Sequence, residues 1–162
     1  MTSVLTLQNV HKTFEAKTPN ENHVLKGIDL KVEKGDFITI IGGNGAGKST
    51  FLNAIAGSLL VDQGTIKIED KDVTKLTANK RASLVSRVFQ DTRMGTASRL
   101  TIEENMAIAD RRGHSFGFGR GVNNKQREQF KEALKLLDLG LENRLTAEVG
   151  LLSGGQRQAL TL

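Results

Sequence analysis

One glycine-rich segment of the sequence carries residues suited to binding phosphate. Gly42 and Gly47 enclose four residues, and Lys48, Ser49 and Thr50 follow at once. Glycine lets the backbone curl so that successive N–H groups point at one anion, and the first turn of a following helix adds a partial positive charge. The Lys48 ammonium can then reach the outer phosphates of a nucleotide, and the Ser49 hydroxyl can bind Mg²⁺. This chemistry predicts a site for a nucleoside triphosphate.

The segments on either side of these glycines fit a phosphate-binding loop. Residues 37–41 are apolar, β-branched and nearly continuous, which predicts a strand buried on both faces. Residues 48–56 can form a helix, so the order is strand, glycine loop and helix, as the Walker A pattern requires. The residues expected to bind the nucleotide are Gly42, Gly43, Asn44, Gly45, Ala46, Gly47, Lys48, Ser49 and Thr50. The pattern alone does not distinguish ATPases, GTPases and small-molecule kinases.

The rest of the chain divides into a strand-rich first half and a helical second half. Alternation of polar and apolar residues predicts strands at residues 4–10, 28–32 and 65–69, and residues 84–89 are expected to form another. Residues 101–104, Thr-Ile-Glu-Glu, form a capping-box pattern at the start of a helix. Apolar residues at helical spacing follow at Phe130, Ala133, Leu134 and Leu137. The fold class predicted by these elements is α/β.

A second motif, Leu-Ser-Gly-Gly-Gln, occupies residues 152–156. Its serine, Ser153, lies 153 − 48 = 105 residues after Lys48. Ser153 is a good N-cap and Gln156 stands at the third helical position, so the two form a Ser-x-x-Gln capping box. A helix that opens with Ser-Gly-Gly exposes unhindered backbone N–H groups beside a hydroxyl, which predicts a second anion site.

Together, residues 42–49 and 152–156 resemble the two motifs of the nucleotide-binding subunit of ABC (ATP-binding cassette) ATPases, and the resemblance extends over residues 4–162. It implies a P-loop NTPase-type core with an antiparallel β portion, and a helical subdomain that carries the second motif, the family's signature. The implied boundaries are residues 1–91 for the core and β portion, 92–152 for the helical subdomain and 153–162 for the start of the signature helix. The implied cofactors are ATP and Mg²⁺.

The resemblance also implies how the two motifs cooperate. In the family, the signature of one subunit faces the γ-phosphate held by the Walker A loop of a second subunit, so two chains enclose two ATP molecules head to tail. The residues expected to act across this dimer are Ser153, Gly154, Gly155 and Gln156. A second nucleotide-binding subunit, in a homodimer, is therefore an expected partner.

Two further residues take roles from the resemblance. Phe14 lies 42 − 14 = 28 residues before Gly42, where family members place an aromatic ring that stacks on adenine; a core phenylalanine at a strand end is the alternative. Gln90 resembles the glutamine that contacts Mg²⁺ and the attacking water, and a polar residue closing a strand is its alternative. The expected catalytic residues are thus Lys48 and Gln90, and the expected metal ligands are Ser49 and Gln90.

The sequence departs from the family pattern in the residues that complete hydrolysis. We find no Walker B motif, which would supply the general base; residues 59–63 mimic its apolar string but end in Gln, and we interpret them as a helix-to-strand turn. The three histidines, His11, His23 and His114, all precede the signature, whereas the family's switch histidine follows it. We expect an amino-terminal part of a longer cassette, whose 162 residues alone bind ATP weakly and hydrolyse it negligibly.

Composition excludes several other classes of protein. Zero cysteines exclude disulfides and thiolate metal sites, and we see no signal peptide and no apolar run that could span a membrane. The net charge is 23 − 18 = +5, and all of this excess lies between residues 111 and 127, in Arg111, Arg112, Arg120, Lys125 and Arg127. A local basic loop does not make a nucleic-acid-binding face, so no nucleic acid is expected. This loop is either solvated or in contact with lipid headgroups or a permease.

The resulting hypothesis is an ATP-binding subunit of an ABC transporter that couples ATP binding and hydrolysis to transport by a separate membrane permease. The expected location is cytoplasmic, on the inner face of the membrane, where the permease holds the subunit. Residues 148–150 resemble the family's loop before the signature, which contacts the membrane domain of a transporter. Similarity to subunits paired with amino-acid-type permeases favours small-molecule uptake with a substrate-binding protein. A non-transport ABC ATPase of the DNA-repair or ribosome-associated type, and a non-hydrolytic nucleotide-binding fragment, remain alternatives.

Overall fold

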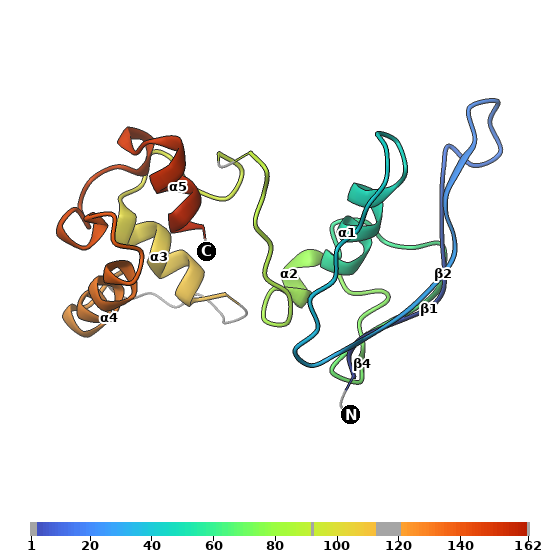
Figure 1. Ribbon diagram of the computed structural model, residues 1–162, viewed down its shortest axis with the longest axis horizontal. Coiled ribbons are helices and arrows are strands. Elements are labelled where there is room, and N and C mark those ends of the chain that lie inside the picture. Colours follow the sequence, from blue (N-terminus) through green and yellow to red (C-terminus); the bar gives the residue numbers. More distant parts are fainter. Residues whose placement is uncertain (1–2, 92, 113–120, 162) are drawn as a thin grey trace. The chain divides into compact units, whose positions relative to one another are not determined.

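The computed structural model describes residues 3–91, 93–112 and 121–161 of the chain. These residues divide into two compact units, Met1–Ser86 and Arg87–Leu162 (Figure 1). The domain boundaries expected at residues 91 and 152 stay predictions. Part of the expected basic loop, including Arg120, lies outside the described residues, as does His114. No described helix is long and apolar enough to cross a membrane.

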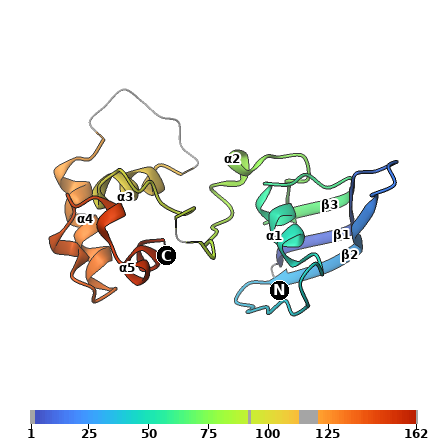
Figure 2. The same cartoon turned by 90° about the horizontal axis from the view of Figure 1, so that it is seen from above.

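The first unit is built on an antiparallel sheet. Its strands are β1 (Ser3–Phe14), β2 (Asn22–Glu33), β3 (Gln63–Ile68) and β4 (Lys71–Asp72), in the order β2-β1-β3-β4. Helix α1 (Lys48–Ala56) packs on one face of this sheet (Figure 2), where Ala54 joins Leu7, Leu25 and Ile66 in a buried core. The strands predicted at residues 4–10, 28–32 and 65–69 and the helix predicted at 48–56 are confirmed.

Two strand predictions are wrong for the described part of the chain. Residues 37–41 and 84–89 form no strand. In the first segment Phe37 is 95% exposed and Ile41 is 90% exposed, instead of buried on both faces. A strand of this apolar kind is stable only when neighbouring strands satisfy its N–H and C=O groups and other elements cover its faces. No described segment pairs with either run, so neither run has a sheet to join.

A buried arginine fixes the carboxyl end of α1. Arg81, the last residue of the short helix α2 (Ala78–Arg81), is 0% exposed. Its guanidinium donates to the carbonyls of Ala54 at 2.7 Å and Ile55 at 2.8 Å, and also to those of Leu76 and Thr74. Burial lowers the pKa of Arg81, but a guanidinium still stays charged at neutral pH. The charge therefore lies at the negative end of the α1 dipole and satisfies carbonyls that a helix end leaves unpaired.

The second unit is helical and has a core of its own. It contains α3 (Ile102–Asp110), α4 (Asn124–Lys135) and α5 (Gly154–Leu160), with 3₁₀ turns at Leu141–Asn143 and Val149–Leu151. The core is apolar and is formed by Ile102, Ala107, Phe130, Leu134, Leu141, Leu145, Val149 and Leu152. The predicted helical spacing is confirmed for Phe130 and Leu134, which form the buried side of α4, whereas Ala133 is exposed and Leu137 follows the end of the helix.

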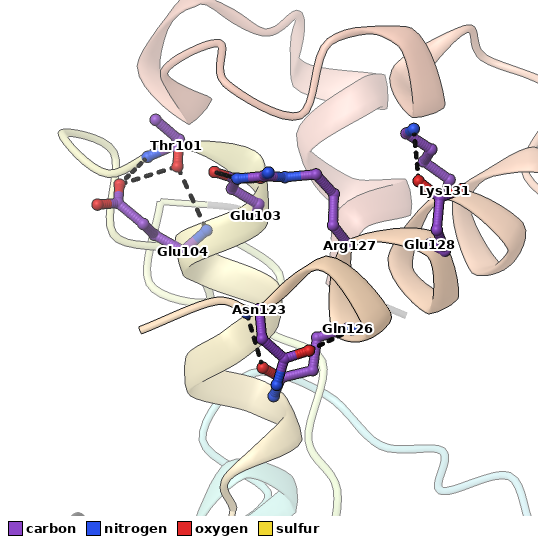
Figure 3. Close-up of polar contacts among 8 residues, drawn as sticks. All are labelled: Thr101, Glu103, Glu104, Asn123, Gln126, Arg127, Glu128 and Lys131. Atoms are coloured by element: carbon purple, nitrogen blue, oxygen red, sulfur yellow. Dashed lines mark hydrogen bonds and ion pairs between the residues drawn. The ribbon is translucent and has the colours of Figure 1, made fainter. Parts of the chain in front are cut away.

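Polar side chains cap the starts of α3 and α4, and an ion pair joins the two helices (Figure 3). Thr101 and Glu104 form the capping box predicted from the sequence, and Asn123 and Gln126 form a second one on α4. The Arg127 guanidinium donates to both carboxylate oxygens of Glu103, at 2.7 and 3.0 Å. Arg127 therefore lies in α4 and is paired with Glu103, which corrects its expected place in a basic loop.

Replacing the buried guanidinium should destabilise the first unit. We expect Arg81→Met to lower the free energy of unfolding by about 3 kcal/mol, because four buried or partly buried carbonyls lose a charged hydrogen-bond donor. The neighbouring Lys80 is exposed, so Lys80→Met is the matched control and should change stability by less than about 0.5 kcal/mol. Urea denaturation monitored by circular dichroism measures both. Equal stability of the two variants would contradict the assigned role.

The capping box on α3 should make stability depend on pH. The Thr101 backbone N–H and then its hydroxyl donate to Glu104 and lower the pKa of that carboxyl. The folded pKa is below the unfolded value, so this stabilisation is present above pH of about 4.3 and is lost as pH falls through the lower folded pKa. We expect the stability difference between wild type and Glu104→Gln to shrink when urea denaturation is moved from pH 7 to pH 3. A difference that stays constant would be inconsistent with this capping box.

Candidate nucleotide-binding site

The loop before α1 has the backbone of a phosphate cradle. The Ala46 N–H donates to the Gly43 carbonyl at 3.3 Å, which closes a tight turn. Gly47 is the N-cap of α1, with φ of 86° in the left-handed region. The Gly47 carbonyl accepts the first helical hydrogen bond, from the Phe51 N–H at 2.8 Å. The loop therefore runs directly into the positive end of the α1 dipole, the place where proteins bind phosphate.

Only glycine fits at position 47. A Cβ atom on Gly47 would lie 2.8 Å from Cγ1 of Val24 on β2, and its positive φ is one that L-residues rarely adopt. This close approach joins the loop to the sheet.

Lys48 is folded over its own loop. Its ammonium donates to the carbonyl of Gly42 at 2.6 Å and to that of Gly43 at 2.7 Å. These two bonds hold the ammonium at the glycine-rich loop. The two carbonyls belong to residues six and five positions before Lys48. Phosphate oxygens that approach the loop compete with these carbonyls for the same ammonium, and a charged acceptor makes the stronger bond.

The Ser49 hydroxyl is the candidate ligand for Mg²⁺ beside the loop. Its side chain lies in the first turn of α1 and is exposed beside Lys48. A hydroxyl is an oxygen ligand of the kind Mg²⁺ prefers, and Mg²⁺ completes its shell with waters and substrate phosphates. Ser49 therefore fits the role expected of it as a metal ligand.

An open apolar groove lies beside the cradle. It has a volume of about 410 Å³, and the residues that line it include Leu25 and Ile28 of β2 together with Ile38, Ile40 and Lys48. Most of its surface is carbon. Residues 38–41 of the unpaired segment and residues 46–48 of the loop and α1 are among the residues that line this groove.

Phe14 belongs to the same unit as the loop and stands at the end of β1. The residue is 38% exposed, which does not fit the alternative of a core phenylalanine at a strand end. The Lys12 ammonium lies 5.8 Å from the ring centroid. Its assignment to adenine stacking stays a prediction, but the ring has a surface available for a base.

Gln90 and the signature both belong to the second unit. Gln90 is exposed and lies in a bend, because the strand expected to end there does not form. Just before it, the Arg87 guanidinium lies 4.6 Å from the centroid of the Phe89 ring. The structure thus groups Gln90 with residues 153–156 and groups Phe14 with residues 42–50.

The signature forms the capped helix that the sequence predicts. Ser153 Oγ accepts from the Gln156 N–H at 3.2 Å, and Gln156 Oε1 accepts from the Ser153 N–H at 3.2 Å. Ser153, Gly154 and Gly155 are exposed at the start of α5. The helix thus presents a hydroxyl and two glycines at its positive end.

Two residues that support these sites escaped the sequence analysis. Arg157, four residues after Ser153, donates to the carbonyls of Gly150 at 3.1 Å and Leu152 at 3.3 Å, and so ties α5 to the turn before it. Asp62 lies in the irregular connection from α1 to β3, so residues 59–63 connect a helix to a strand as expected, with Gln63 already in β3. Its carboxylate accepts from Lys12 and Thr13, next to Phe14. The position of Arg157 four residues after the N-cap could have predicted its contacts with the turn before α5. The contacts of Asp62 are with residues about fifty positions away, so no local pattern predicts them.

The fold is that of an ATP-binding cassette. It is similar to a dimeric ATP-binding cassette in a post-hydrolysis state bound to ADP and Pi, with a TM-score of 0.76 and 26% identity over 97% of this chain and 66% of that one. It is also similar to an ATP-binding cassette of an ABC transporter in its ADP conformation, with a TM-score of 0.74 and 29% identity over 99% of this chain and 63% of that one.

The chain belongs to the ABC transporter family, whose sequence pattern residues 25–162 match. It is 35% identical over 159 residues to a tyrosine transport ATP-binding protein of Clostridioides difficile (strain R20291). That alignment covers 98% of this chain, which spans 63% of the length of the relative.

The left-handed turn at the N-cap of α1 gives a direct test of the loop geometry. We expect Gly47→Ala to lower the free energy of unfolding by about 1–2 kcal/mol, because the methyl group meets Val24 and the backbone is forced into a strained conformation. At Gly43 an added Cβ meets nothing within 4 Å and φ is not positive, so Gly43→Ala is the matched control. Urea denaturation of the two variants should separate them. Equal stabilities would show that the turn at Gly47 is not strained by a side chain.

Proposed function

We propose that this chain forms the nucleotide-binding part of the ATP-hydrolysing subunit of an ABC transporter. The observation that carries the proposal is the cradle of residues 42–47 at the positive end of α1, with the Lys48 ammonium held at its mouth. The family membership supports ATP as the nucleotide. The triphosphate binds in the cradle, with backbone N–H groups and Lys48 on its oxygens.

Each residue then has a distinct task. Ser49 holds Mg²⁺ together with phosphate oxygens, and the cation neutralises charge on the phosphates. Phe14 stacks on the adenine, and Gln90 orients the attacking water and contacts the cation. The general base that polarises the water is not supplied by any residue assigned in this sequence.

A second copy of the protein completes the site. The exposed Ser153, Gly154 and Gly155 of one subunit contact the γ-phosphate bound by the other, as the capped start of α5 allows. One chain therefore binds nucleotide, and two chains close on it head to tail.

The remaining partners are a separate membrane permease and a substrate-binding protein, with the subunit on the cytoplasmic face of the membrane. Uptake of an amino-acid-type solute is supported by the relative described as a tyrosine transport ATP-binding protein. Residues 148–150, which lie against Leu100 and Ser98 through backbone hydrogen bonds, are the segment that contacts the permease.

The ammonium at the cradle decides whether nucleotide binds there. We expect Lys48→Ala to weaken MgATP binding at least about tenfold, because the phosphates lose a charge-assisted hydrogen-bond donor. Lys71 is an exposed lysine on β4 of the same unit, and Lys71→Ala should leave the affinity within about twofold. Isothermal titration calorimetry measures both. Unchanged MgATP affinity in Lys48→Ala would reject the proposed site.

A further inference from the structure

Asp62 is connected to three consecutive residues of β1. Its backbone N–H donates to the carbonyl of His11 at 2.9 Å. Its carboxylate accepts from the Lys12 ammonium and from the Thr13 N–H, each at 2.7 Å. The residue that follows this triplet is Phe14, the last residue of β1.

These contacts lie beyond the point where β3 stops pairing with β1. β1 pairs with β3 as far as His11 and Gln63, and Asp62 is the residue immediately before β3 begins. On its other edge β1 stays paired with β2 to the end, where Phe14 faces Asn22. The Asp62 carboxylate therefore replaces β3 as the partner of the last residues of β1, and Phe14 lies on a strand end held from both sides.

The same carboxylate binds the Lys12 ammonium, which lies beside the Phe14 ring. The Lys12 side chain is only 16% exposed, its ammonium is bound to Asp62, and it lies 5.8 Å from the ring centroid. This distance is within the range of a cation–π contact. Although burial acts to raise it, the hydrogen bonds from Lys12 and Thr13 hold the pKa of Asp62 below its ordinary value, so the carboxylate is ionised at neutral pH.

We propose that Asp62 is a positioning residue for recognition of the nucleotide base. Its carboxylate holds the end of β1 and keeps the Lys12 ammonium against the Phe14 ring, so that the exposed part of this ring is presented to a purine base. The proposal rests on the proposed function, because it gives Phe14 the role of the stacking residue. It assigns Asp62 a part in base binding and none in phosphate binding.

The test compares two ligands on the same protein. MgATP contacts both the base site and the phosphate site, whereas inorganic triphosphate with Mg²⁺ contacts only the phosphate site. The ratio of their two dissociation constants, measured by calorimetry on one sample, does not depend on the fraction of protein that is folded. This ratio is therefore a readout that a purely structural role of Asp62 does not change.

We expect Asp62→Ala to weaken MgATP binding about fivefold, as part of the base-stacking contribution is lost, and to leave triphosphate binding within about twofold. Asp62→Asn keeps an oxygen for Thr13 but loses the ion pair with Lys12, so it gives a smaller loss and serves if the alanine variant does not fold. Asp29 also accepts a backbone N–H of β1, from Asn9 at 2.8 Å, and Asp29→Asn is the matched control.

Three results would overturn the proposal. If Asp62→Ala weakens both ligands equally, Asp62 acts on the phosphate loop or the whole unit. If neither affinity changes, Asp62 has no part in binding. If the wild-type protein binds neither ligand, the proposed function fails as well, and this outcome is distinguishable because it precedes any substitution.

Discussion

The position of α1 against the sheet is the constraint on which the phosphate cradle depends. At its amino end, the close approach of Gly47 to Val24 leaves no room for a side chain, so loop and sheet are in direct contact. At its carboxyl end, the Arg81 guanidinium holds the carbonyls of Ala54 and Ile55. A helix fixed at both ends keeps its dipole and the N–H groups of its first turn in one direction. In the proposed nucleotide complex, the Lys48 ammonium would leave the carbonyls of Gly42 and Gly43 for phosphate oxygens.

The second unit fixes the exposed start of α5 by contacts of its own. Backbone hydrogen bonds join Ile102 to Ala147 and Val149 to Leu100, so the segment before the signature runs beside the start of α3. Arg157 then ties α5 to the turn that precedes it, and the capping box fixes its first residues. The exposed start of α5 thus belongs to a unit whose buried core is formed by that unit's own residues.

Local sequence predicts the elements whose stability is local. The bounds of α1, the capping boxes at Thr101 and Ser153 and the alternating strands all follow from short-range patterns. The strand predicted at residues 37–41 fails, because an apolar run becomes a strand only when other strands pair with it. Contacts between distant residues were also missed. Thr13 and Asp62 are 49 residues apart, and Ala54 and Arg81 are 27 apart, so no short-range pattern relates them.

The measurement that tests the central claim most directly is a crystal structure of the protein with Mg²⁺ and a non-hydrolysable ATP analogue. We predict that the triphosphate lies in the loop of residues 42–47, that the Lys48 ammonium leaves the carbonyls of Gly42 and Gly43 for phosphate oxygens, and that Ser49 Oγ binds the Mg²⁺. A nucleotide bound elsewhere, with the Lys48 ammonium still on both carbonyls, would contradict the assignment of this loop as the nucleotide-binding site.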